Sequence, residues 1–185
     1  RMWLKTIHER VEKVKKLTQN LLQSGRSQKT DQKRVRVSDL VRDALSLLGA
    51  KFFTEGTYVT LQMDEHLYTY VDEGQIGQVL INLFINTHHA MLDSTRKEII
   101  VSTYSKETEI YISIKDFGHG ISPKNLLKIF NPLFTTKGEY AASNSKLAQI
   151  KGTGLGLSIC KRFVENQNGR ILVESKENEI GRAHV

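Results

Sequence analysis

Residues 75–90 read QIGQVLINLFINTHHA, and their spacing predicts a helix that carries a polar stripe in an otherwise apolar segment. Residues three or four positions apart lie on the same side of a helix. Asparagine is a poor helix former and is costly to bury without a partner. The two asparagines therefore either hydrogen-bond a neighbouring strand or offer amide oxygens to a hard cation such as Mg²⁺, and the stripe alone leaves both interpretations open. The stripe consists of Gln75, Gln78, Asn82, Asn86 and His89.

Strand-like and helical patterns alternate on both sides of this helix. Asp72, with Gln75 three residues later, is typical of a capping box, and the helix is predicted to run to about Leu92. Ser38 is a favourable N-cap for an earlier helix, and Pro123 is a favourable first residue for a later one. This alternation predicts an α/β fold with a layer of helices on one sheet. Strands are expected at 34–37, 58–63, 67–71, 99–104, 110–115, 170–175 and 181–185, and further helices from 38, at 123–130 and at 154–167.

The N-terminal residues 1–24 have the pattern of one amphipathic helix. Its apolar positions recur at intervals of three and four, which makes a heptad seam that needs a partner helix. That partner is expected to be another copy of the chain or a helix outside this sequence, and the alternative is a helix that folds back on its own domain. Residues 25–34 are polar and predict a linker, which leaves 35–185 as the main domain. The seam consists of Leu4, Ile7, Val11, Val14, Thr18 and Leu21.

The composition limits the classes of protein that the chain can belong to. Its 185 residues are 39% hydrophobic and 25% charged, which permits a buried core in one domain. The net charge of +7 suits an anionic partner, but the basic clusters at 5–16 and 26–36 lack interleaved aromatics, so nucleic-acid binding is not expected. The single cysteine, Cys160, excludes a disulfide framework, and a cytoplasmic location is expected. Any membrane anchor of a longer parent protein would lie outside this chain.

A second motif, DFGHGI at residues 116–121, follows directly after a predicted strand. A carboxylate at a strand end can accept a hydrogen bond from an exocyclic amine, such as the one that adenine offers. The glycines at 118 and 120 let a ligand approach the backbone closely. Alone, the pattern is also compatible with a tight turn that Asp116 stabilises.

A third motif, GTGLGLS at residues 152–158, leads into a predicted helix. Glycines at a helix N-terminus present free N–H groups and the positive end of the helix dipole, which together bind phosphate. The motif is not a P-loop, because the G-K-[ST] ending is absent, and not the dinucleotide fingerprint, because no strand leads into it. A packing role for the glycines is the alternative. Residues 129–137, IFNPLFTTK, lie between the second and third motifs.

Together these motifs resemble the nucleotide-binding domain of sensor histidine kinases, within the ATPase superfamily of gyrase B, Hsp90 and MutL. In the family's order, residues 82–90 resemble the N box, 116–121 the G1 box, 130–137 the F box and 152–158 the G2 box. The resemblance implies a two-layer α/β sandwich of the Bergerat type, with a mixed sheet and helices on one face. Residues 1–24 resemble the second helix of the family's dimerisation hairpin.

The resemblance also implies a role for each residue. Asp116 would accept the adenine amine, Asn86 would bind Mg²⁺ with support from Asn82, and His89 would lie near the phosphates. Residues 122–151 would form the lid over ATP, anchored by Phe130 and Phe134. ATP and Mg²⁺ are therefore the implied cofactors. The further implied nucleotide contacts are Gly118, Gly120, Ile121, Phe130, Thr135, Thr136, Lys137, Gly152, Thr153, Gly154, Leu155, Gly156 and Leu157.

The reaction implied is transfer of the γ-phosphoryl group of ATP to a histidine on the dimerisation hairpin. Hydrolysing members of the superfamily carry a glutamate where this chain has Asn82, and an amide cannot act as general base near neutral pH. A related serine kinase, a hydrolysing ATPase and a non-enzymatic binding module are the alternatives. The implied partners are a response-regulator receiver domain and a second copy of the chain, joined through the N-terminal helix.

The phospho-accepting histidine is expected to lie outside this sequence. The family carries it on the first hairpin helix, and only a second helix is recognisable here. His8 is followed by Glu9, which imitates the start of the acceptor motif, but Lys13 stands where the family usually has a proline. We therefore do not expect His8 to be the acceptor.

Overall fold

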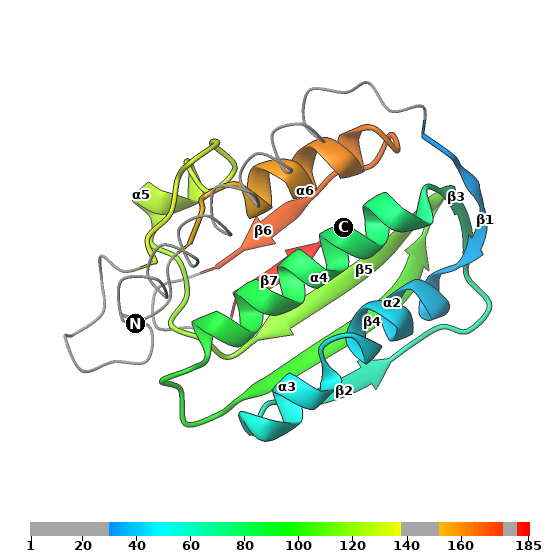
Figure 1. Ribbon diagram of the computed structural model, residues 1–185. Helices are drawn as coiled ribbons and strands as arrows, with labels where there is room; N and C mark the ends of the chain where they lie inside the picture. Colours follow the sequence, from blue (N-terminus) through cyan, green and yellow to red (C-terminus); the bar gives the residue numbers. More distant parts are fainter. Residues whose placement is uncertain (1–29, 138–151, 176–180) are drawn as a thin grey trace, which may run out of the picture.

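The computed structural model describes residues 30–137, 152–175 and 181–185, and the predicted helix at 1–24 lies outside them. Five strands form one mixed sheet in the order β2-β4-β5-β7-β6, and β1 and β3 form a separate antiparallel pair (Figure 1). The strands are β1 Lys33–Arg36, β2 Tyr58–Gln62, β3 Tyr68–Val71, β4 Glu98–Lys106, β5 Glu109–Asp116, β6 Leu172–Glu174 and β7 Gly181–His184. The helices are α2 Val37–Ser46, α3 Gly49–Thr54, α4 Glu73–Ala90, α5 Pro123–Leu126 and α6 Gly156–Glu165.

Helices α2, α4 and α6 lie over one face of the five-stranded sheet, with α4 in the middle (Figure 1). The predicted α/β class with helices on one face is therefore confirmed. Cys160 of α6 is fully buried against α4, and burial raises the pKa of its thiol to about 12. No helix in the described part of the chain is long and apolar enough to cross a membrane. The buried core includes Val37, Leu40 and Val41 of α2, Ile76, Val79, Leu80, Leu83 and Phe84 of α4, Ile159, Cys160, Phe163 and Val164 of α6, and Ile99, Val101, Ile112 and Ile114 of the sheet.

The central helix α4 begins as its sequence predicts. The Asp72 side chain accepts a hydrogen bond from the Gln75 backbone N–H at 3.0 Å and caps the helix. The reciprocal bond of a capping box is absent, because the Asp72 N–H donates to the side chain of Gln167 instead. Gln167 also donates to Gln75 at 3.2 Å, so the start of the polar stripe ties α4 to the residues after α6. The helix ends at Ala90, two residues before the predicted end at Leu92.

The predicted hairpin of β4 and β5 is confirmed, and it forms the centre of the sheet. Its register pairs Ile100 with Lys115 and Lys106 with Glu109. Side chains alternate between the faces of the sheet, so Ile99 and Val101 are buried under the helices. Strand β5 runs to Asp116 and therefore delivers the second motif at the end of a central strand.

Several predicted element boundaries are wrong for physical reasons. Ser38 does not cap α2, because β1 pairs with β3 as far as Arg36 and the helix begins at once with Val37. The helix predicted at 123–130 ends at Leu126. The helix predicted at 154–167 begins only at Gly156, since Gly154 has a φ of +70° and cannot belong to it. The short helix α3 was not predicted, and β1 begins at Lys33, inside the predicted linker 25–34.

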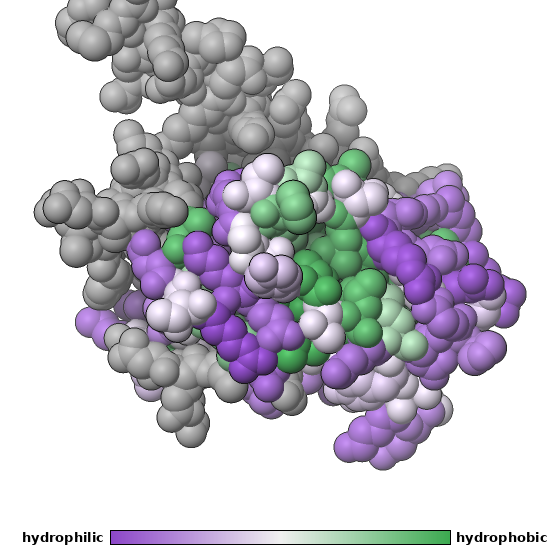
Figure 2. Space-filling view, turned by 90° about the horizontal axis from the view of Figure 1, so that it is seen from below, coloured by the Kyte–Doolittle hydropathy of each residue, from purple (hydrophilic) through white to green (hydrophobic). Residues whose placement is uncertain are grey.

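One edge of the sheet carries exposed apolar side chains. Figure 2 views the molecule from below, the side on which α3 and β2 lie in Figure 1, and shows an apolar area framed by hydrophilic residues. Strand β2 is an edge of the five-stranded sheet. The exposed large hydrophobic residues on these elements or next to them are Leu47, Phe53, Tyr58 and Leu61.

Candidate functional site

The end of β5 packs directly against the end of α4, which brings the first two motifs together. A Cβ atom on Gly118 would lie 2.7 Å from the backbone oxygen of Ala90, so only glycine permits this approach. The His119 N–H donates to the same Ala90 oxygen at 3.2 Å. The G1 motif is therefore fixed to the last turn of the helix that carries Asn86 and His89.

Asp116 offers a part-buried carboxylate at this junction. Its Oδ1 accepts a hydrogen bond from the Gly118 N–H at 2.9 Å. Burial raises the pKa of Asp116 above its usual value, while the Gly118 amide and His119 act in the opposite direction. Oδ1 is engaged with the turn, and no group in the described part of the chain donates to the other oxygen, which can therefore accept a hydrogen bond from a ligand. The expected turn-stabilising role and the expected ligand-binding role are thus compatible in one side chain.

The F-box segment packs on the glycines of the G2 motif. A Cβ atom on Gly154 would come within 2.3 Å of the Leu133 carbonyl carbon, and both residues have positive φ, +70° and +67°. The space beside Gly152 is filled by the Thr135 side chain, whose Oγ1 would lie 2.5 Å from a Cβ there. The glycines therefore serve packing between two loops as well as leading into α6.

The N-terminus of α6 lies next to the polar stripe of α4. A Cβ on Gly156, the first residue of α6, would be 4.0 Å from the amide carbon of Asn82. The Thr153 hydroxyl accepts a bond from the Leu155 N–H at 3.4 Å. A ten-residue helix that begins here directs the positive end of its dipole toward this part of α4.

Lys137, the last residue of the F-box motif, reaches across to α4. Its Nζ donates to the Asn86 Oδ1 at 2.8 Å and lies 3.0 Å from the His89 Nδ1. Burial, and then the charge of Lys51, lowers the pKa of Lys137 to about 8. The pKa of His89 is lowered to about 4, first by burial and then by Lys137. His89 is therefore neutral near pH 7 and can accept the lysine's hydrogen bond.

The neighbouring histidine, His88, faces away from the site. It is fully buried, its Nδ1 lies 2.9 Å from the Thr57 Oγ1 and its Nε2 lies 2.7 Å from the Glu55 Oε2. Its ring stacks on Phe52. The two adjacent histidines therefore have different surroundings, and the described residues hold no cluster of three or more His, Cys, Asp or Glu that could bind a metal.

The other predicted site residues lie around this junction, and they differ in their hydrogen bonds, burial and backbone conformation. The Ile121 N–H donates to the Ser175 Oγ at 2.9 Å, a partner that the sequence motifs did not indicate. Phe130 and Leu157 are partly buried and pack against the core. Gly120 has a φ of +71°. The Thr135 Oγ1 accepts a bond from the Lys137 N–H at 3.2 Å, and Thr136 follows it in the chain, half-buried.

A family model matches the part of the chain that carries these motifs. The model of the histidine kinase-, DNA gyrase B-, and HSP90-like ATPases matches residues 71–184, which is more than half of the chain. The chain belongs to this family. The match runs from just before the α4 helix cap through β7 and so includes the α4 stripe and both glycine motifs.

Curated relatives of this ATPase-family domain include proteins named as histidine kinases. Sensor histidine kinase ZraS of Salmonella typhimurium is 30% identical over 149 residues, which cover 78% of this chain and 29% of the relative. The signal transduction histidine-protein kinase AtoS of Escherichia coli is 29% identical over 175 residues, which cover 94% of this chain and 26% of AtoS. The chain thus spans less than a third of the length of these relatives.

Solved structures agree with the fold of the ATPase-family domain. The catalytic domain of histidine kinase ThkA, in a nucleotide-free form, superposes with a TM-score of 0.67 at 28% identity and covers 84% of this chain and 97% of that domain. A structure of ThkA in complex with the response regulator protein TrrA gives a TM-score of 0.75 at 22% identity and covers 99% of this chain and 50% of that chain.

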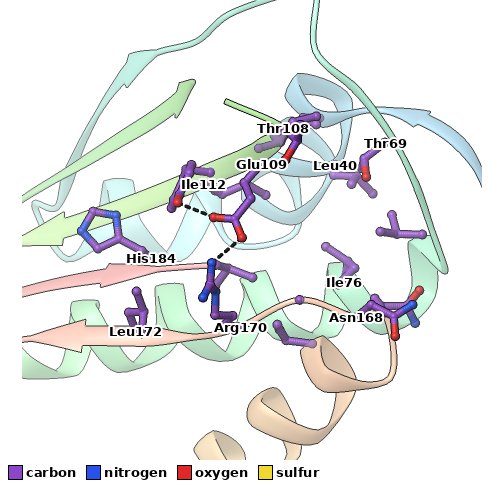
Figure 3. A pocket seen from close by; sticks show the side chains of 18 residues that line it. Leu40, Thr69, Ile76, Thr108, Glu109, Ile112, Asn168, Arg170, Leu172 and His184 are labelled. Carbon is purple, nitrogen blue, oxygen red and sulfur yellow. Dashed lines mark hydrogen bonds and ion pairs between the residues drawn. The ribbon is translucent and has the colours of Figure 1, made fainter. Parts of the chain in front are cut away.

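A pocket of about 300 Å³ lies at the opposite end of the ATPase-family domain (Figure 3). Its wall includes Glu109 to Ile112 of β5, Leu172 of β6 and Arg170 just before β6. Strand β7 lies between β5 and β6, and the pocket lies near its C-terminal end. An ion pair joins Glu109 to Arg170 at its rim (Figure 3). None of the motif residues of the candidate site lines this pocket, so we do not assign the site to it.

Proposed function

We propose that this chain is the ATP-binding catalytic domain of a sensor histidine kinase, which transfers the γ-phosphoryl group of ATP to a histidine on a dimerisation hairpin. The observation that carries the proposal is the convergence of four motifs on one junction. Asp116, the C-terminal half of α4, the F-box segment and the start of α6 meet there through direct contacts. Family membership and the sensor kinases among the relatives support it.

In this proposal Asp116 selects adenine. Its free carboxylate oxygen accepts a hydrogen bond from the exocyclic amine, and the Gly118 bond holds the carboxylate in place. Guanine has a carbonyl at that edge and would place an acceptor opposite an acceptor. Gly118, Gly120 and Ile121 provide the backbone against which the nucleotide lies.

The Asn86 amide oxygen is proposed as the Mg²⁺ ligand. Its present partner is the ammonium group of Lys137, so this oxygen already faces a cation, which fits a metal-binding role. Mg²⁺ bound there would neutralise phosphate charge. Asn82, one turn earlier, would support the site through its amide. The proposed phosphate contacts come from His89, Thr135, Thr136, Lys137 and from residues 152–157 at the start of α6.

Asn82 favours transfer over hydrolysis. It lies on α4 beside the first residue of α6. Hydrolysing members of the superfamily carry a glutamate as general base at this position, and an amide has no basic site at neutral pH. Phosphoryl transfer requires mainly positioning and charge neutralisation, which the amides and cations of this site supply. The proposed acceptor is a histidine outside this chain, since Lys13 stands where the acceptor motif that begins with the family's histidine usually has a proline.

The proposed partners follow from the same assignment. ThkA was solved in complex with the response regulator TrrA, and we propose a response-regulator receiver domain as a partner here too. Residues 1–24 would pair with a second copy of the chain in the complete protein. The need for ATP supports a cytoplasmic location, and no nucleic-acid partner is proposed.

Calorimetry with ATP and GTP tests the proposal through Asp116. We expect ATP to bind and GTP to bind far more weakly. Asp116→Asn places a donor opposite the adenine amine and should weaken ATP binding by about 2–3 kcal/mol, roughly 30- to 150-fold. The control Asp43→Asn changes an exposed carboxylate on α2 and should leave ATP affinity unchanged. Equal ATP affinity of the wild type and Asp116→Asn would overturn the assignment.

A further inference from the structure

Lys137 places a positive charge on the one amide oxygen that the proposed metal needs. The Lys137 Nζ lies 2.8 Å from the Asn86 Oδ1, a distance at which the ammonium donates a full hydrogen bond. The same nitrogen lies 3.0 Å from the His89 Nδ1. Both contacts are made to α4, 48 and 51 residues earlier in the chain, so they fix the end of the F-box segment to the polar stripe.

Packing of the Lys137 methylene chain positions its ammonium group for the hydrogen bond to Asn86. A Cβ on Gly152 would lie 3.1 Å from the Lys137 Cδ and 3.3 Å from its Cβ, so the stem runs directly along this glycine. The Lys137 N–H is held by the Thr135 Oγ1 at 3.2 Å. The head group is therefore guided onto Asn86 by the F-box turn and the G2 glycine together.

The charge of Lys137 has no counter-ion in the described part of the chain. The two atoms that face the ammonium, Asn86 Oδ1 and His89 Nδ1, belong to neutral groups, an amide and an imidazole. Lys137 takes part in none of the ion pairs among the described residues, and the charged side chain that acts on it is another lysine, Lys51. A part-buried cation that no carboxylate of the described residues neutralises favours an incoming anion and opposes a second cation.

We propose that Lys137 occupies the place of Mg²⁺ on Asn86 in the nucleotide-free protein, and that Mg²⁺ binds only by displacing it onto the phosphates. This inference rests on the proposed function. Mg²⁺ and the Lys137 ammonium cannot both contact the Asn86 oxygen, because two cations bound to one oxygen atom would repel each other strongly. ATP supplies the negative charge that makes the exchange favourable, so Lys137 couples metal binding to nucleotide binding.

The test measures ATP affinity by calorimetry over a series of Mg²⁺ concentrations, for wild type and Lys137→Met. Methionine keeps the unbranched stem and removes the charge. In Lys137→Met we expect the ATP affinity without metal to fall, because one cation near the phosphates is lost. We expect the Mg²⁺ midpoint, the Mg²⁺ concentration that gives half of the metal's effect on ATP affinity, to fall at least threefold, because the ammonium no longer competes for the Asn86 oxygen. An unchanged or higher Mg²⁺ midpoint in Lys137→Met overturns the proposal.

Two further variants make the test specific. Lys106→Met removes an exposed lysine at the end of β4, at the far end of the β4–β5 hairpin from Asp116, and should leave the Mg²⁺ midpoint unchanged. In the Asn86→Ala background Lys137→Met should no longer shift the midpoint, since the contested oxygen is absent. A shift of the same size in that background would show that Lys137 does not act through Asn86, and would overturn the proposal.

The outcomes separate this inference from the proposed function. Absence of any ATP binding to the wild-type protein contradicts the proposed function itself. ATP binding with an Asp116 dependence but without a Lys137 effect on the Mg²⁺ midpoint contradicts only the displacement. Lys137→Gln is the second variant if Lys137→Met does not give a cooperative thermal transition, because glutamine keeps a hydrogen-bond donor without the charge.

Discussion

The role of Asn86 in metal-dependent ATP binding can be measured separately from adenine recognition. Its amide oxygen points to Lys137, whereas Asp116 lies at the end of β5 and bonds to Gly118. Asn86→Ala should therefore weaken ATP binding in the presence of Mg²⁺ about tenfold or more, the loss of one charged hydrogen-bonding partner. ADP binding without metal should change little. Calorimetry with both ligands checks this, and equal losses would indicate a folding role for Asn86.

His89 gives a dependence of stability on pH. Burial, followed by Lys137, lowers its folded-state pKa from 6.5 to about 4, so between these values the unfolded state binds more protons than the folded state. The free energy of unfolding should fall as the pH is lowered from about 6.5 toward 4. Urea unfolding at pH 7 and pH 5 should show a smaller loss for His89→Gln than for wild type. The exposed His66→Gln is the control, and equal losses in wild type and His89→Gln would contradict the assignment.

The local chemistry of single residues could be predicted from the sequence, but their long-range partners could not. Asp72 caps α4 because its partner lies three residues away. The bond between Lys137 and Asn86 joins residues 51 positions apart, and no pattern in either segment contains it. His88 and His89 look alike in sequence, yet one is buried against Glu55 and the other faces Lys137. Burial by distant elements decides such differences.

At the scale of elements, two glycines should respond to alanine in opposite ways. Gly77 lies inside α4 with nothing within 4 Å of a Cβ position, so Gly77→Ala should stabilise the protein by about 0.5–1 kcal/mol. Gly154 has a φ of +70° and abuts the Leu133 backbone. Gly154→Ala should destabilise it by more than about 1 kcal/mol and weaken ATP binding. Urea unfolding of the two variants compares them directly, and a stabilised Gly154→Ala would show that the two loops do not pack as described.

Elements with strong periodic patterns were predicted well, and their ends were set by tertiary contacts. The hairpin of β4 and β5 follows from alternation on both strands. Helix α2 begins one residue before the favourable cap Ser38, because the Val37 N–H donates to the Leu67 oxygen at the end of the β1–β3 pair. Helix α3 has no periodic pattern of useful length and was missed. Helix α6 begins two residues late because Gly154 is used for packing on Leu133.

At the scale of the whole molecule, the fold separates the candidate site from the pocket. Helix α4 and strand β5 run along the length of the domain (Figure 1), so the motifs that follow them meet at one end and the β4–β5 hairpin turn lies at the other. The pocket lies by the hairpin, and Ile112 and Leu172 line it (Figure 3). The end of α4 and the end of β5 therefore bring the N-box and G1 motifs together at one end of the domain.

A titration with Mg²⁺-ATP, followed by the amide chemical shifts of the protein, shows which residues surround the bound nucleotide. We expect shifts for residues 116–121, residues 152–157 and the C-terminal half of α4. Residues 109–112 and 170–172 around the pocket should shift little. Shifts concentrated around the pocket, or no shifts with saturating Mg²⁺-ATP, would contradict the claim that the four motifs form a nucleotide site.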